Sequence, residues 1–244
     1  MKKLIGIFTV ICLTIILAAE IELPRVEEGE VVISHVGYTL SYNETHEQAN
    51  WVAYELTAEE VAGEVERKDA FRADPEVESG SAALADYRSS GYDRGHLAPA
   101  ADMKWSAEAM SESFYMSNMS PQKPRFNRGI WKKLETKVRG WATREGAVLI
   151  VTAGVLRPRL KTIGVNKVSV PKRFYKVILD NREPELKGIG FILPNKGSAK
   201  PLSDYAFTID KVESVTGIDF FHSLADEIEE TVESTLDLSK WDFQ

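Results

Sequence analysis

The sequence feature that most constrains the fold is a helix pattern followed directly by an apolar strand pattern, within residues 127–153. From Asn127 to about Glu145, apolar residues recur at the three- and four-residue spacing of a helix that packs one face on a core: Ile130, Leu134, Val138 and Trp141. Residues 147–153 are almost unbroken apolar and mostly β-branched, which indicates an interior strand. Together the two patterns predict a buried sheet with this helix against it.

The remaining patterns extend this arrangement over most of the chain. Strand patterns occupy residues 31–40, 51–56, 114–116, 168–179 and 186–193, and helix patterns begin at 57 and cover 106–113, 208–216 and 225–236. No linker, repeat or low-complexity segment interrupts them. We therefore predict one α+β domain over residues 31–244, with a mostly antiparallel central sheet flanked by helices. Residues 20–30, acidic with one proline and one glycine, are expected to form a flexible leader.

The first residues have the composition of a targeting segment. Two lysines precede an apolar run that ends in small residues at position 19, which is typical of a signal peptide over residues 1–19. The run is short for crossing a bilayer and no basic cluster follows it, so export is favoured over a membrane anchor. The expected location is the periplasm or the cell exterior, with no stable membrane association after cleavage. The only cysteine, Cys12, lies in this segment, which excludes disulfides and thiolate chemistry from the mature chain.

The charge is unevenly distributed along the chain. A formal net charge of −7 argues against a protein that coats nucleic acid with its whole surface. Basic residues nevertheless gather on and before the long helix, with Glu135 as the acidic exception among them: Lys123, Arg125, Arg128, Lys132, Lys133, Lys137 and Arg139. Such a run is often only a solvated helix face. Within an acidic chain it favours a groove that follows a phosphate backbone, with DNA and RNA as partners.

Two short runs carry the residue types of a catalytic site. The first contains Asp93-Arg94-Gly95-His96 and continues to Pro99-Ala100-Ala101-Asp102-Met103. A histidine that directly follows an arginine and a glycine is an unusual core residue, and a neutral imidazole accepts a proton near neutral pH. The second run begins at Asn118, and Asn127 opens the long helix, with Glu135 following further along it.

These runs resemble the DNA/RNA non-specific endonuclease family, the ββα-metal nucleases that include mitochondrial endonuclease G-like and secreted bacterial enzymes. The resemblance covers about residues 31–235 and also takes in Trp51–Leu56 and Thr216–Phe221. It implies an exported endonuclease that hydrolyses DNA and RNA with little sequence preference and leaves 5′-phosphate products. Mg²⁺ is the implied cofactor, with Mn²⁺ as an alternative. The oligomeric state is left open, and a homodimer is compatible with the family.

The resemblance also implies roles for single residues. His96 would activate water as the general base, Arg94 would clamp the phosphate, and Asn127 would bind the metal. Glu135 would hold water around that metal, because residues eight positions apart share one side of a regular helix. Asn118, Arg128 and Arg139 would contact substrate. An upstream arginine would also contact phosphate, and Arg67 and Arg72 both qualify. Gly95 is expected to leave space for substrate or metal.

Each residue also has a plainer interpretation. His96 could be a hydrogen-bonded structural histidine, Asn127 an ordinary helix N-cap and Glu135 a solvated partner of Arg139. His35 and His46 have no second ligand at metal spacing and are expected at the surface or at a sheet edge. The rival functions are a catalytically inactive, secreted nucleic-acid-binding protein on the same fold and a phosphodiesterase for small nucleotides. A serine hydrolase is excluded because the chain has no Gly-x-Ser-x-Gly elbow.

Overall fold

The computed structural model describes residues 21–182 and 184–243, so the signal peptide expected at residues 1–19 lies outside the described residues. Among the described residues, seven strands form one antiparallel sheet in the order β1-β2-β3-β6-β9-β10-β11. They are β1 (Val31–Ser34), β2 (Thr39–Asn43), β3 (Gln48–Thr57), β6 (Ala147–Gly154), β9 (Arg173–Asp180), β10 (Lys187–Pro194) and β11 (Ala206–Phe207). The predicted α+β class with a mostly antiparallel sheet is confirmed.

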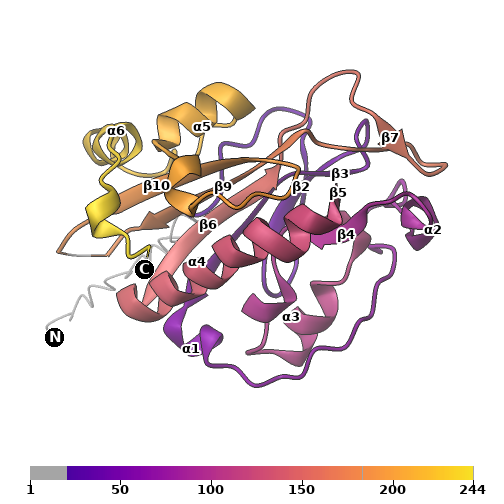
Figure 1. The fold of residues 1–244 in the computed structure, drawn as a ribbon, viewed down its shortest axis with the longest axis horizontal. Helices are drawn as coiled ribbons and strands as arrows, with labels where there is room; N and C mark the ends of the chain where they lie inside the picture. Colours follow the sequence, from indigo (N-terminus) through magenta and orange to yellow (C-terminus); the bar gives the residue numbers. More distant parts are fainter. Residues whose placement is uncertain (1–20, 183, 244) are drawn as a thin grey trace, which may run out of the picture.

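Helices cover both faces of this sheet (Figure 1). The long helix α4 (Lys132–Glu145) lies on one face, together with α1 (Ala58–Val61) and α3 (Ala107–Glu112). The other face carries α5 (Ile209–Thr216) and α6 (Asp226–Ser234). Shorter pieces are α2 (Leu84–Tyr87), η1 (Ala100–Asp102), η2 (Met116–Asn118), η4 (Leu202–Tyr205) and η5 (Leu238–Lys240). Two small antiparallel pairs lie beside the sheet, β4 (Asp93–His96) with β5 (Met119–Gln122) and β7 (Thr162–Ile163) with β8 (Val168–Ser169).

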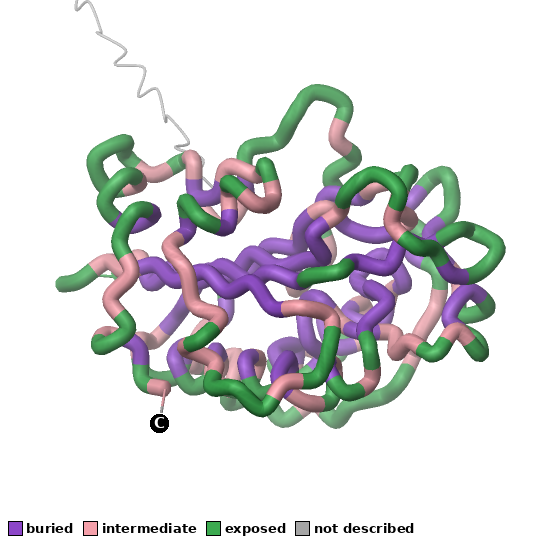
Figure 2. Tube along the Cα trace, turned by 45° about the horizontal axis from the view of Figure 1, so that its top comes forward, coloured by how far each residue is buried: buried purple, intermediate pink, exposed green. Residues whose placement is uncertain are grey.

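The core lies between the sheet and α4, as the helix and strand patterns of residues 127–153 predict. Every residue of β6 is buried, and so are Leu134, Val138 and Trp141 on α4. Figure 2 shows the buried strands passing through the middle of the molecule, with exposed segments on the outside. Because an antiparallel sheet buried on both faces needs apolar residues at successive positions, the unbroken apolar run of β6 belongs at its centre.

The expected helix from Asn127 does not start as a regular α-helix. Residues 126–131 form η3 (Phe126–Trp131), and the helix is kinked there at Gly129, which has non-helical angles of φ −111° and ψ −110°. The rotation expected between Asn127 and Glu135 on a regular helix therefore does not hold, and the N-cap interpretation of Asn127 fails because Arg125 is the residue before the helix.

Three other expectations need correction. Residues 31–40 form two strands rather than one, because the chain turns at Gly37. A glycine is needed at this turn because a Cβ would lie 2.4 Å from Met103 Sδ. The strand expected at 114–116 is a single bridge between Arg72 and Tyr115. The described part of the leader is anchored instead of free, since Ile21 and Leu23 pack on the core and Arg25 pairs with Asp219 at 2.6 Å.

Across residues 21–182 and 184–243, no helix combines the length and the apolar character that a membrane span requires.

Candidate functional site

The site is built on the β4–β5 pair and the helix start that follows it. All of Asp93-Arg94-Gly95-His96 forms β4, with Asp93 opposite Gln122 and His96 opposite Met119 on β5. The chain then passes through Lys123–Arg125 into η3 and α4. Two strands followed by a helix therefore bring the two catalytic-type runs of the sequence into one unit, which carries His96, Asn127 and Glu135 (Figure 1).

His96 lies between aromatic rings. Its imidazole packs edge-on against Phe114 at 5.0 Å between ring centroids and against Phe71 at 5.7 Å. Its Nε2 is buried and has no hydrogen-bond partner among the described residues. Burial, followed by the positive charges of Arg67 and Arg94, lowers the pKa of His96 to about 3. The imidazole is therefore neutral at physiological pH and has a ring nitrogen without a protein partner, which is the form a general base requires.

Asn127 is oriented by an acidic residue of the motif. Its Nδ2 donates to Asp93 Oδ2 at 3.0 Å, which leaves its Oδ1 without a hydrogen-bond donor among the described residues. Arg128 donates to both oxygens of Asp93 at 2.9 and 2.7 Å. An amide oxygen held ready in this way fits a hard cation such as Mg²⁺, which prefers oxygen ligands. Arg128, expected to contact substrate, pairs with Asp93 through its guanidinium, and its side chain is 73% exposed.

Glu135 is half-buried and belongs to a group of charges under α4, in which Asp102 and Lys176 are buried. Asp102 accepts hydrogen bonds from Tyr54 Oη at 2.8 Å and from Arg139 Nη1 at 2.7 Å. Lys176 of β9 is 1% exposed, and its Nζ has no hydrogen-bond partner among the described residues but lies 5.2 Å from the Trp131 ring centroid. Burial raises the pKa of Glu135 and lowers that of Lys176, and the attraction between the two opposes both shifts.

Sequence reasoning missed Lys176. The available signal was a lysine inside the apolar run Phe174-Tyr175-Lys176-Val177-Ile178, where a charge needs a reason. Its neighbours could not be predicted, because they depend on the packing of α4 over β9. Arg139, expected to contact substrate, is 19% exposed and is committed to its ion pair with Asp102.

Asn118 has a structural position in place of the expected substrate contact. It is fully buried, its Oδ1 accepts from the Ala98 N–H at 2.9 Å, and its Nδ2 donates to the carbonyls of Ala98 and Ser113 at 2.9 and 2.8 Å. The two bonds to Ala98 join the segment after β4 to the segment before β5, and the third ties Asn118 to the end of α3. Asn118 therefore fixes the spacing of the two strands that carry the site.

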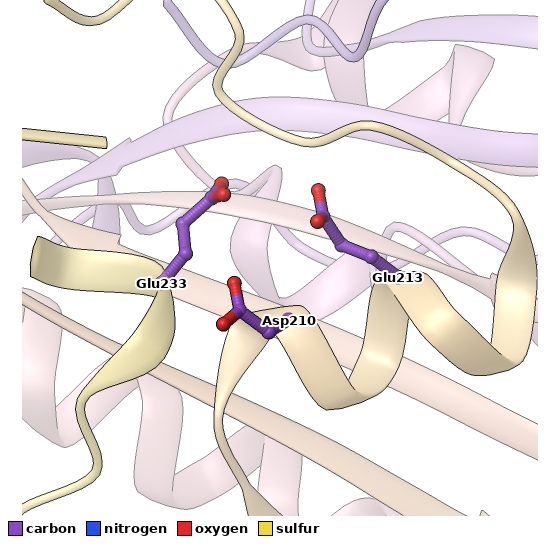
Figure 3. Close-up of side chains that lie close together, drawn as sticks. All are labelled: Asp210, Glu213 and Glu233. Carbon is purple, nitrogen blue, oxygen red and sulfur yellow. The ribbon is translucent and has the colours of Figure 1, made fainter. Parts of the chain in front are cut away.

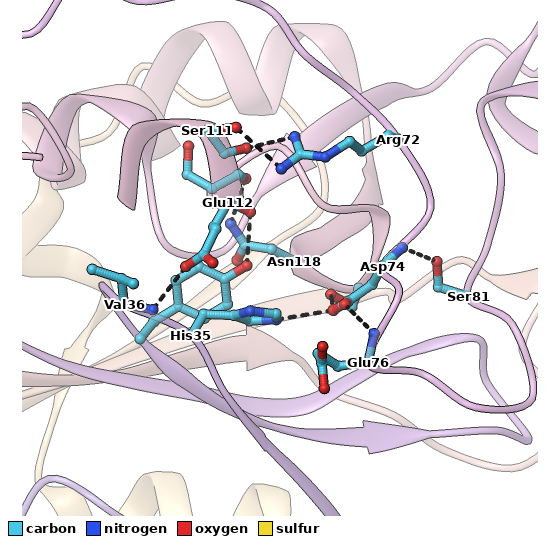
Figure 4. Close-up of polar contacts among 12 residues, drawn as sticks. His35, Val36, Arg72, Asp74, Glu76, Ser81, Ser111, Glu112 and Asn118 are labelled. Carbon is cyan, nitrogen blue, oxygen red and sulfur yellow. Dashed lines mark hydrogen bonds and ion pairs between the residues drawn. The ribbon is translucent and has the colours of Figure 1, made fainter. Parts of the chain in front are cut away.

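A polar network anchors the loop that follows Phe71 (Figure 4). His35 Nε2 lies 3.0 Å from Asp74 Oδ2, Ser117 also donates to Asp74, and the Asp74 N–H donates to Ser81 at 2.9 Å. The His35 side chain is 3% exposed, so of the two expected positions the surface is wrong, whereas His35 does follow the edge strand β1. Because Asp74 follows Phe71 closely in the chain, this network holds the aromatic wall of the site.

The geometry of this unit can be compared with known proteins. Residues 23–227 match the DNA/RNA non-specific endonuclease family. The chain belongs to that family. The mitochondrial nuclease EXOG of Danio rerio is 34% identical over 215 residues, which are 81% of this chain and 63% of that protein. A nuclease of Nostoc sp. is 36% identical over 214 residues, 82% of this chain and 76% of that one.

A solved structure of the same family also matches. It is a crystal structure of the EndoG/EndoGI complex that describes the mechanism of EndoG inhibition, with a TM-score of 0.76 and 33% identity, covering 83% of this chain and 89% of that chain. The predicted family and fold are therefore confirmed. The chain spans less than two thirds of the length of the Danio rerio relative.

The structure separates Arg67 and Arg72, the two candidates for an upstream phosphate contact. Arg72 donates to the carbonyls of Ala70 and Ser111, and its Cζ lies 4.1 Å from the Tyr115 ring centroid (Figure 4). Its guanidinium is therefore already engaged in contacts within the protein. Arg67 is 55% exposed, pairs with Asp69 at 2.7 Å, and lies 5.1 Å from the Phe114 ring. Arg94 stacks on Phe71 at 4.2 Å. Arg67 and Arg94 thus place positive charge against the two aromatic rings that contact His96.

Gly95 has a different structural role from the expected one of leaving space for substrate or metal. A Cβ on Gly95 would lie 2.2 Å from Cδ of Gln122, so the space beside Gly95 is filled by a side chain of β5 and not left for substrate. Gln122 is fully buried, and neither of its amide atoms has a hydrogen-bond partner among the described residues. Gly95 is therefore required by the close approach of β4 and β5.

Grooves with basic edges run beside this site. One, of about 880 Å³, follows α4 and is lined by Arg128, Lys132, Lys133, Lys137 and Arg144, with residues 199–203 opposite. A second, of about 780 Å³, is lined by Lys123, Arg125 and Lys196. Most of the basic cluster identified in the sequence therefore lines open grooves. This arrangement favours binding of a polyanion over the interpretation of the cluster as a merely solvated helix face.

Proposed function

We propose that this protein is a metal-dependent endonuclease that hydrolyses phosphodiester bonds of DNA and RNA with little sequence preference and leaves 5′-phosphate products. The observation that carries the proposal is the unpartnered Nε2 of His96, held by Phe71 and Phe114 in the same ββα unit as the oriented Asn127. A structural histidine would be expected to use its buried ring nitrogen in a hydrogen bond. The Nε2 of His96 makes no such bond and is available to a reactant.

Each of these side chains has a separate role in hydrolysis. Neutral His96 takes the proton of the attacking water through its unpartnered Nε2. Arg94 and the more exposed Arg67 supply positive charge for the phosphate oxygens, and Arg67 is the upstream arginine that we favour. Asn127 Oδ1 would hold Mg²⁺, with Mn²⁺ as the alternative, which would neutralise charge on the phosphoryl and leaving oxygens. Glu135 would accept hydrogen bonds from water around that cation.

The substrate that fits is a polymer. Basic residues line one groove along α4 and a second groove beside residues 123–125, which supports binding of a phosphate backbone with several charges. No feature of the described residues reads base edges in the manner of a helix-turn-helix or a zinc finger, which supports backbone binding without sequence readout. Cleavage of plasmid but not of a dinucleotide is the expected result, and equal cleavage of both would favour a small-nucleotide phosphodiesterase.

The decisive experiment compares the wild-type protein with His96→Ala on supercoiled plasmid and ribosomal RNA, with Mg²⁺ and with EDTA. We expect the wild type to degrade both polymers only with metal, and the variant to lose at least about 100-fold in rate, the usual contribution of a general base. Full metal-dependent activity in the variant would refute the assignment of His96. If the wild type shifts DNA on a gel without cutting it, the protein is a binding module on this fold.

We also propose that the protein is exported after cleavage near residue 19, to the periplasm or the cell exterior. The support is the lysine pair and apolar run at the start of the sequence. Family members include mitochondrial proteins as well, so location does not follow from the family. Sequencing the N-terminus of the protein recovered from periplasm and medium tests this, and an intact Met1 in the cytoplasmic fraction would contradict it.

A further inference from the structure

An acidic cluster joins the two helices on the face of the sheet that α4 does not cover. Asp210 and Glu213 of α5 and Glu233 of α6 each offer a carboxylate oxygen, and these oxygens all lie within 4.8 Å of one another. Figure 3 shows the three carboxylates pointing into the space between the helices. The proposed nuclease site uses none of these residues.

Glu233 is the member that needs an explanation. It is 5% exposed, and its Oε1 is buried without a hydrogen-bond partner among the described residues. It lies in the last turn of α6, where the negative end of the helix dipole disfavours a carboxylate. In the described part of the chain, no lysine or arginine forms an ion pair with Asp210, Glu213 or Glu233. A buried acid in this setting requires either a proton or a cation.

The backbone forces these carboxylates together. A Cβ on Gly188 of β10 would lie 2.5 Å from Ile209 Cδ1 and 2.9 Å from Val232 Cγ1, so this glycine lets both α5 and α6 pack closely on the strand. Ile209 precedes Asp210, and Val232 precedes Glu233. The apolar contacts that seat the two helices therefore also set the distance between their acids.

The surroundings add negative charge and offer little to offset it. Burial raises the pKa of Glu233 to about 9, with Glu213 and Glu229 as the largest charged contributors. Asp219 is also close, and Arg25 is engaged in an ion pair with it at 2.6 Å. Without a cation, Glu233 holds a proton at neutral pH, and a bound divalent ion would have to displace that proton.

We propose that Asp210, Glu213 and Glu233 bind a hard divalent cation, calcium, which fastens α6 to α5. Carboxylate oxygens from three side chains suit Ca²⁺, which takes six to eight oxygens in flexible geometry, whereas Mg²⁺ usually keeps its waters and takes one or two carboxylates. Glu213 Oε1 accepts from the Phe220 N–H at 2.7 Å, which orients this carboxylate. Asp210 is exposed, so water completes the coordination on that side.

The test separates this site from the nuclease site. Thermal unfolding of the full-length Asn127→Ala variant, stripped of metal, is measured in EDTA, in about 5 mM Ca²⁺ and in about 5 mM Mg²⁺, because extracellular calcium sites bind in the millimolar range or below. Asn127→Ala removes the proposed catalytic ligand, so a shift cannot come from there. We expect Ca²⁺ to raise the melting temperature by about 5 °C, and Mg²⁺ to raise it by less.

Charge-matched variants in the same background locate the effect. Glu233→Gln should abolish the calcium shift, whereas Glu230→Gln, an exposed change of equal charge on the same helix, should retain it. Isothermal titration should give one Ca²⁺ per chain, with release of about one proton at pH 7. Asp210→Asn, at an exposed position, replaces Glu233→Gln if that variant does not fold, and should weaken calcium binding at least about tenfold.

Three results would overturn the proposal. The first is no calcium shift in Asn127→Ala, and the second is an undiminished shift in Glu233→Gln. In either of these, Glu233 is simply a protonated buried acid. An equal shift with Mg²⁺ would overturn the choice of calcium. None of these results depends on whether the protein cleaves nucleic acid.

Discussion

At the scale of single residues, the site is defined by polar atoms that lack partners as much as by those that have them. Nε2 of His96 is left open, while the amide of Asn118 is fully used and that of Asn127 is half used. In a folded protein most buried polar atoms are paired, so the exceptions are informative. Lys176 Nζ is another such atom, and it shares its surroundings with Glu135 and Asp102.

We predict that Lys176→Met lowers the rate constant of cleavage about 10- to 100-fold with little change in KM, and shifts the acid limb of the pH–rate profile upward. The pKa of Glu135 is already raised by burial and is held down first by Lys176, so without that charge the carboxylate ionises only at higher pH. Methionine has a similar volume, and an apolar replacement of a buried ion is usually tolerated by the fold.

The control for this prediction is Lys132→Met, which removes an exposed lysine with a weaker influence on Glu135. Its pH profile should move less than that of Lys176→Met, although its affinity for DNA should fall. Identical pH profiles for Lys176→Met and the wild type, measured on folded protein, would show that Lys176 does not act through Glu135.

At the scale of elements, the β4–β5 pair depends on one close approach. We predict that Gly95→Ala destabilises the protein by about 1–3 kcal/mol, because its Cβ would overlap Gln122 and the buried strand pair has to shift. Chemical denaturation measures this free energy of unfolding. The double variant Gly95→Ala, Gln122→Ala should recover part of the loss. A loss of activity at unchanged stability would instead favour the original expectation that Gly95 leaves space for substrate.

The contact between α5 and α6 should give a pH dependence in metal-free protein. The pKa of Glu233 is about 9 in the folded state, against an ordinary value of 4.5, so across that window the folded chain keeps a proton that the unfolded chain releases. Stability should therefore fall as pH rises from about 5 to about 9, the reverse of a salt-bridged carboxylate. Denaturation in EDTA at several pH values measures the slope. Glu233→Gln should flatten it, and an unchanged slope would show that another group is responsible.

At the scale of the whole molecule, an acidic protein presents a local basic face. We predict that Lys132→Gln and Lys133→Gln, each in the His96→Ala background, weaken binding to different DNA sequences equally and reduce the slope of log K against log salt concentration by about 1 for each lysine replaced. Both lysines line the groove along α4. Lys211→Gln, an exposed change on α5, is the matched control and should leave the salt slope unchanged. Sequence-dependent losses of affinity would contradict backbone binding.

The sequence by itself determined the family, the α+β class and the central helix and strand. The stripe on α4, the buried strand β6 and the Thr57–Glu60 capping box follow from local periodicity and local hydrogen bonds, which need no distant contact. The residue types at His96, Asn127 and Glu135 also indicate their chemistry without coordinates. Tertiary structure decided which contacts the side chains make. Arg72 bonds to the carbonyl of Ser111, Arg67 stays more exposed near Phe114, Asn118 links the segments beside β4 and β5, and Lys176 lies buried where its charge acts on Glu135. These outcomes depend on burial and on partners far away in the chain, and the spacing of residues along a sequence contains neither.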